Sequence, residues 1–171
     1  MKTKSCRFTY RVLAVLIVLG VIMLAYSLWA RPNQLTWGAS EEEQKRVMPG
    51  DELHGEVDFY ATRAITINFS PENIWPWIIQ MGYGRAGYYG YDLLEILGSP
   101  RGIRSAEQIL PEFQDFQVGD PLPISMLVTH IIAALEENRA VVWSSLEGDQ
   151  PGAITWALYP VGPNQTRLVS R

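Results

Sequence analysis

The chain has 171 residues, of which 47% are hydrophobic and 19% are charged, and it contains one cysteine. This length allows one ordinary domain plus an appendage, which excludes a multidomain enzyme. The ordinary apolar fraction excludes a charge-swollen disordered chain, and a single cysteine excludes a disulfide scaffold within the chain.

The formal net charge of −4 averages two regions of opposite sign. Residues 1–30 contain no acidic side chain and four basic ones: Lys2, Lys4, Arg7 and Arg11. All eighteen acidic residues therefore lie in the rest of the chain, which has no basic stripe. Nucleic-acid binding would lack its usual electrostatic source there, so we expect no nucleic-acid partner.

The basic segment 1–11 precedes residues 12–30, which have no charged side chain. As a helix this run would be about 28 Å long, close to the hydrocarbon thickness of about 30 Å. We predict an uncleaved transmembrane anchor, with Tyr26 and Trp29 suited to the membrane interface. The preceding bases predict a cytoplasmic N-terminus and a domain outside. A cleaved signal peptide, with a small-x-small site at residues 25–27, and a buried core helix are the alternatives.

Residues 31–56 are predicted to be a linker with one short helix, because turn residues bound them and no apolar period is sustained. Ser40 could cap that helix, with Glu41, Glu42 and Glu43 in its first turn near the positive end of the helix dipole. No histidine accompanies these glutamates at ligand spacing, so we expect no metal site there.

Residues 57–171 are predicted to form the domain. Alternation over residues 57–69 predicts a half-buried strand with Arg63 on its apolar side. Ser70 and Pro71 then predict a helix start. Residues 82–92 contain four glycines and four tyrosines, a pattern typical of a glycine-hinged aromatic loop.

The remainder of the chain has a β character. Four apolar runs separated by short polar turns predict an antiparallel meander. These runs are residues 124–135, 140–146, 153–161 and 166–171.

Eight short strings between about residue 35 and the last residue carry a family resemblance. They are Trp37-Gly38-Ala39, Pro49-Gly50-Asp51, Thr62-Arg63-Ala64-Ile65-Thr66-Ile67, Trp75-Pro76-Trp77 with Gln80-Met81-Gly82, Arg85-Ala86-Gly87-Tyr88-Tyr89, Tyr91-Asp92, Val118-Gly119-Asp120 and Thr166-Arg167-Leu168. In these strings and in its order of elements, the chain resembles the SRPBCC superfamily, also called START-like or Bet v 1-like. That superfamily includes polyketide cyclases/dehydrases and lipid-transport proteins, and the chain looks like a membrane-anchored bacterial branch of it.

The resemblance implies an α+β helix-grip fold. In that fold a curved antiparallel sheet wraps around a long C-terminal helix, two short helices follow the first strand, and an apolar cavity lies between sheet and helix. The sequence departs from this pattern because it stops at Arg171 with no amphipathic helix following. We therefore expect either a truncated product or a cavity open on that side, with exposed apolar surface.

The chain offers few groups for catalysis. His54, in the linker, and His130, in an apolar strand, have no obvious partner, so we assign no catalytic residue, metal or cofactor. Arg63 could pair with Asp92 and fix the aromatic loop to the sheet. Alternatively, Arg63 or Arg85 could meet an anionic ligand head group.

An apolar wall with a few polar groups is typical of small-molecule pockets, although aromatic residues are equally good core material. The candidate ligand-binding residues are Arg63, Trp75, Trp77, Tyr83, Arg85, Tyr88, Tyr89, Tyr91, Asp92, His130, Trp143 and Trp156.

These observations and the resemblance predict a single-pass, membrane-anchored START-like domain that binds a hydrophobic or amphipathic small molecule, such as a lipid or a polyketide-like compound. One alternative is a cyclase or aromatase-type enzyme that uses the same cavity, with His130, Tyr88 or Asp92 as acid or base. Another is a structural or interaction protein. The direction in which His130 points separates the first alternative from the others.

Overall fold

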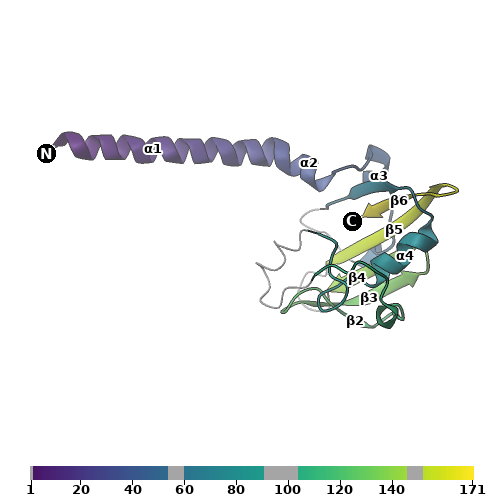
Figure 1. Cartoon of the computed structure of the whole chain (residues 1–171). Coiled ribbons are helices and arrows are strands. Elements are labelled where there is room, and N and C mark those ends of the chain that lie inside the picture. Colours follow the sequence, from purple (N-terminus) through teal and green to yellow (C-terminus); the bar gives the residue numbers. More distant parts are fainter. Residues whose placement is uncertain (1, 54–59, 91–103, 146–151) are drawn as a thin grey trace.

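A computed structural model describes residues 2–53, 60–90, 104–145 and 152–171. Its N-terminal part is one long helical segment that extends away from the domain (Figure 1). Within it, α1 (Lys2–Ala25) continues through the π-helical turn η1 (Tyr26–Ala30) into α2 (Arg31–Leu35). By length and composition, Tyr10–Leu35 could cross a membrane, and none of its apolar window is buried inside the structure. The predicted helix over residues 12–30 is therefore confirmed as a helix and as a candidate membrane span.

The domain is built on a six-stranded antiparallel sheet with the order β1-β6-β5-β4-β3-β2. The four consecutive strands β3 to β6 confirm the predicted meander, and β1 pairs with the last strand. The strands are β1 (Arg63–Ile67), β2 (Pro121–Pro123), β3 (Thr129–Glu136), β4 (Ala140–Ser145), β5 (Ala153–Gly162) and β6 (Gln165–Ser170).

Two strand boundaries differ from the predictions. The strand expected over residues 57–69 is shorter, because residues 60–62 are not in a strand and residues 57–59 lie outside the described residues. The apolar run 124–135 divides into a turn at residues 124–128 and the strand β3. An apolar run does not reveal a turn within it, since this turn is built from backbone and serine hydrogen bonds rather than from glycine or proline.

Few helices accompany the sheet, which confirms the α+β class. The main one, α4 (Pro71–Ile79), begins with Pro71 as predicted. The Ser70 hydroxyl does not cap its backbone; it accepts a hydrogen bond from the side-chain amide of Asn73 instead, at 2.9 Å. The other helical elements of the described domain are the short helix α3 (Glu41–Lys45) and the single 3-10 turns η2 (Asp51–Leu53) and η3 (Pro111–Phe113).

Apolar clusters cover both faces of the sheet. The face against α4, here called the helix face, buries Ile132, Val141, Trp143 and Leu158 together with Ile74, Trp75, Ile78 and Ile79 of α4. The opposite face, here called the cover face, buries Ala64, Ala140, Ala157 and Val169 under Met48. A sheet covered on both faces explains why few strand residues of the meander are fully exposed.

The segment that covers this second face, residues 37–53, was predicted to belong to a linker. Instead it packs on the sheet, with Met48 1% exposed and Ala64 donating its backbone N–H to the Trp37 carbonyl at 3.1 Å. The predicted short helix is present as α3 (Glu41–Lys45), and Ser40 and Glu43 form a full capping box. Most side chains of this segment are polar, so the sequence alone favoured a solvated linker. In the structure these side chains bind partners in β6 and at Arg171, which lie far away in the sequence.

Candidate functional site

Three of the predicted aromatic residues meet on the helix face. Trp143 of β4 and Trp156 of β5 lie with their ring centroids 5.8 Å apart, and Trp75 of α4 packs in the same apolar cluster. Trp143 is 3% exposed, whereas Trp156 is only partly buried. The central strands and α4 thus form an aromatic wall.

His130 lies on the same face of the sheet as this wall. It alternates in phase with Ile132 of β3, and the register places it between Leu122 of β2 and Ser145 of β4. Burial lowers the pKa of its imidazole below the usual value. His130 therefore lies on the inner side of the domain, where burial favours the neutral form of its imidazole.

Two polar atoms on this wall have no hydrogen-bond partner within the described parts of the chain: Nδ1 of His130 and Nε1 of Trp156. Both atoms are buried. Leaving a buried polar group unpaired costs about 1–3 kcal/mol, so native structures rarely contain such groups without a role or an unseen partner. A bound molecule that supplies the missing hydrogen bonds would remove this cost.

A groove of about 360 Å³ opens at the sheet edge, between β1 and α4. Its lining is formed by Ile67, Phe69, Asn73, Ile74 and Trp77. Phe69 is 62% exposed although it is a large apolar residue. The groove lies within the size range of small-molecule sites, which are mostly apolar with few polar groups.

Tyrosines of the glycine-rich loop hold neighbouring segments in place. The Tyr88 hydroxyl donates to the Ile124 carbonyl at 2.7 Å, and the Tyr83 N–H donates to the Pro123 carbonyl at 2.9 Å. Tyr89 packs edge-on against Trp77 with centroids 5.6 Å apart, and burial raises the pKa of its hydroxyl. The described loop residues thus support the β2–β3 turn and α4, while Tyr91 and Asp92 lie outside the described residues.

Arg85 is bound within the domain. Its Nη2 donates to the carbonyls of Ile79, at 3.2 Å, and Phe113, at 2.9 Å. The guanidinium also lies over the rings of Phe113 and Phe116, 4.4 and 4.0 Å from their centroids. Burial lowers the pKa of the Arg85 guanidinium, and the charge of Asp120 partly opposes this shift. These contacts favour a structural role over an anionic ligand for Arg85.

Arg63 is exposed at the sheet edge, so its charge has the access to water that its place on the apolar side of the strand requires. Its Nε donates to the Gln34 carbonyl, in the last turn of α2, at 2.9 Å. A basic side chain is favourable at a helix C-terminus, where carbonyls lack intrahelical partners. Arg63 therefore ties the end of the apolar helix to β1, and its predicted partner Asp92 falls outside the described residues.

Gln80, which the sequence analysis named only within a family string and not as a site residue, is fully buried and joins the end of α4 to neighbouring segments. Its Oε1 accepts from the Leu110 N–H at 2.8 Å, and its Nε2 donates to the Tyr89 hydroxyl at 2.6 Å. The available signal was a lone amide between the apolar residues Ile79 and Met81.

Within the described ranges, no group of three or more His, Cys, Asp or Glu side chains could hold a metal ion.

No family model matches the chain, and no curated protein matches it. Two solved structures are similar. Protein MLL2253 from Mesorhizobium loti is 17% identical with a TM-score of 0.34, over 64% of this chain and 75% of that one. The polyketide-cyclase-like protein Cgl2372 from Corynebacterium glutamicum is 16% identical with a TM-score of 0.33, over 64% of this chain and 62% of that one.

Proposed function

We propose that the domain holds an amphipathic small molecule against the helix face, at the surface of a membrane in which α1 is anchored. The observation that carries this proposal is the pair of buried, unpaired polar atoms, Trp156 Nε1 and His130 Nδ1, on an otherwise apolar wall. Burial of the ligand's own apolar surface against this wall would contribute roughly 25 cal/mol per Å² before ordering costs. The two nitrogens would orient the ligand.

The donors and acceptors on the wall point to an uncharged polar group on the ligand. An indole N–H can only donate, so the ligand must present an acceptor to Trp156, and neutral His130 can donate or accept. Arg63 Nε and Arg85 Nη2 are already engaged by backbone carbonyls, while the buried Nε of Arg85 has no partner among the described residues. A carbonyl or hydroxyl group on an apolar body, as in a neutral lipid or a polyketide-like compound, fits this arrangement better than a carboxylate or phosphate.

The link between helix and sheet supports a site close to the bilayer. Arg63 joins β1 to the last turn of α2, and the Trp37 carbonyl accepts a hydrogen bond from Ala64 of the same strand. The domain is therefore held at the end of the helix, not on a long tether. A ligand that leaves a membrane would have a short path to the helix face.

Trp156→Phe is expected to weaken ligand binding by about 1 kcal/mol, roughly fivefold, because it removes one hydrogen-bond donor and keeps an aromatic ring. The measurement is mass spectrometry of molecules that co-purify with the full chain, followed by titration of the recovered compound. Trp37→Phe is the matched control, since Trp37 is 63% exposed and belongs to the cover segment. Recovery of the full chain with no bound molecule, together with no binding to a panel of neutral lipids and polyketides, would contradict the proposal.

The orientation of His130 favours one second candidate function, an acid–base reaction on the same ligand. A neutral imidazole on the helix face could accept a proton from a bound carbonyl compound. His130→Asn would then abolish product formation while the ligand remains bound. Equal turnover of a poly-β-ketone substrate by His130→Asn and the unmodified chain would exclude this role.

A further inference from the structure

The turn between β2 and β3, residues 124–128, exposes an unusual amount of apolar surface. Leu127 is 95% exposed, Met126 54% and Val128 45%. The surrounding residues 121–129 carry no charged side chain. This group of three side chains, here called the apolar tip, is an exposed patch that neither the fold nor the proposed ligand site explains.

Four of the five backbone N–H groups of residues 124–128 are hydrogen-bonded within the turn. Ile124 and Ser125 donate their N–H groups to the Val128 carbonyl at 2.8 and 3.1 Å. The Ser125 hydroxyl accepts from the N–H groups of Leu127 and Val128, at 3.2 and 3.1 Å. Such a turn can enter a region poor in water without leaving these N–H groups unpaired. Because the hydrogen bonds already hold the turn in one conformation, little conformational entropy is lost on insertion.

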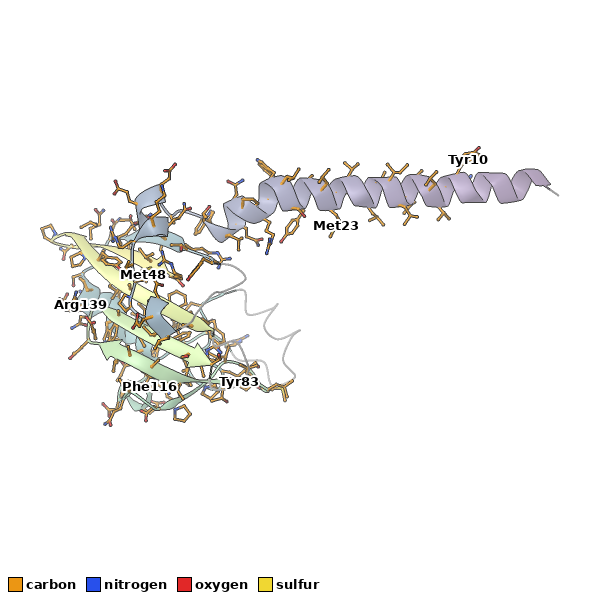
Figure 2. All side chains as sticks on the ribbon, turned by 180° about the vertical axis from the view of Figure 1, so that it is seen from behind. Tyr10, Met23, Met48, Tyr83, Phe116 and Arg139 are labelled. Carbon is orange, nitrogen blue, oxygen red and sulfur yellow. The ribbon has the colours of Figure 1, made fainter. Side chains whose placement is uncertain are left out.

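The position of the tip relative to the apolar helix suggests its partner. The tip lies at the sheet end where β3 begins and β6 ends, and this end is on the side of the domain from which α1 extends (Figure 1). The view from behind agrees, with Tyr83, whose N–H bonds to Pro123 beside the tip, on the same side as the helix (Figure 2). Near the end of that helix, Trp29 is 75% exposed in η1, as suits an aromatic residue at a membrane interface.

We propose that the apolar tip inserts into the interface of the bilayer that anchors α1, as a second and independent membrane contact. This inference rests on the anchor of the proposed function. Because the tip carries no charge, its partner is the apolar and glycerol region of a zwitterionic lipid, with no need for anionic head groups. Two contacts on one side would fix the rotation of the domain about the helix axis and hold the start of β3, with His130, towards the lipid.

The test uses the full chain in phosphatidylcholine vesicles, with Cys6→Ser removing the single cysteine. An environment-sensitive fluorophore is attached at Leu127→Cys. The matched control is Val161→Cys, an apolar residue 55% exposed beside the β5–β6 turn at the opposite end of the sheet. Ile17→Cys, within α1, reports on the anchor alone. We expect blue-shifted emission and loss of most fluorescence to nitroxide-labelled lipid at positions 17 and 127, and little change at 161.

The outcomes separate the two proposals. Quenching at position 17 without quenching at 127 would overturn the membrane contact of the tip and leave the anchor intact. Absence of quenching at both positions would overturn the anchor and the inference that rests on it. A blue shift at position 127 that nitroxide lipid does not quench would mean that the tip is buried against protein, such as a second copy of the chain, and would also overturn the inference.

Discussion

Glu43→Gln is expected to lower the free energy of unfolding by about 2–4 kcal/mol. The substitution breaks a largely buried ion pair and leaves the positive charge of Arg167 without a negative partner. Arg167 of β6 binds both carboxylate oxygens of Glu43, Nε to Oε1 at 2.7 Å and Nη2 to Oε2 at 2.9 Å. The same guanidinium donates to the Gly38 carbonyl and to the Thr66 hydroxyl. Chemical denaturation of the full chain in detergent measures the change.

Glu41→Gln is the matched control for this substitution. Glu41 lies in the same helical turn and pairs with Lys45 at 3.5 Å, but both side chains are almost fully exposed. Exposed pairs contribute about 0–1 kcal/mol, so the control should unfold nearly as the unmodified chain does. Equal losses for the two variants would show that the contact between Glu43 and Arg167 does not hold the cover segment.

The same ion pair makes stability depend on pH in acid. The hydrogen bonds from Arg167, aided by the Ser40 backbone and opposed by burial, lower the pKa of Glu43 from 4.5 to about 2. The unfolded chain therefore binds more protons than the folded chain between these values, so the contribution is complete above about pH 4.5 and is lost as the pH falls towards 2. The stability difference between the unmodified chain and Glu43→Gln should shrink over this interval. A difference that stays constant from pH 6 to pH 2.5 would contradict it.

Gly38→Ala is the second change with a large expected effect, about 3–5 kcal/mol of lost stability. Gly38 has a φ of +73°, and an added Cβ would stand 2.1 Å from the Ala64 carbonyl oxygen of β1. Since that oxygen is backbone within the sheet, the cover segment must move away from the strand. We expect faster proteolysis within residues 37–53 as well as a lower midpoint of denaturation.

Gly84→Ala separates the steric clash from the strain of positive φ. Gly84 has nearly the same φ, +72°, but nothing lies within 4 Å of an added Cβ. This control should cost about 1 kcal/mol, the usual penalty for an alanine in the left-handed region. If both alanine variants lose the same stability, the close approach of Gly38 to β1 has no energetic importance.

The cover segment, residues 37–53, also connects the apolar helix to the sheet that carries the proposed ligand site. Arg171, at the end of the described chain, donates to Asp51 at 2.7 Å and to the carbonyls of Glu43 and Arg46, at 3.0 and 2.8 Å. Together with Arg167, it fastens the segment that follows the apolar helix onto the cover face of β6. Trp156 lies on β5, which pairs with β6. The contacts on the cover face therefore also fix the position of the helix face relative to the apolar helix.

The sequence was sufficient to predict those elements whose formation depends on residues only a few positions apart. The apolar helix, the capping box of Ser40 and Glu43 and the β meander follow from periodicity, cap residues and short turns, which act over a few residues. The presence of His130 in a strand was predicted in the same way, but the face on which it lies depends on a register shift between Ile132 and Ala134 of β3.

The tertiary structure decided the rest. The partner of Glu43 is 124 positions away and that of Asp51 is 120, so segment 31–56 reads as a solvated linker until β6 is placed beside it. Arg63 contacts Gln34 of α2, and the unpaired nitrogens of His130 and Trp156 lie on one face of the sheet only because β3, β4 and β5 are adjacent. The physical reason is that local propensity specifies which residues form an element, whereas pairing of distant charges and burial of polar atoms are set by which elements pack together.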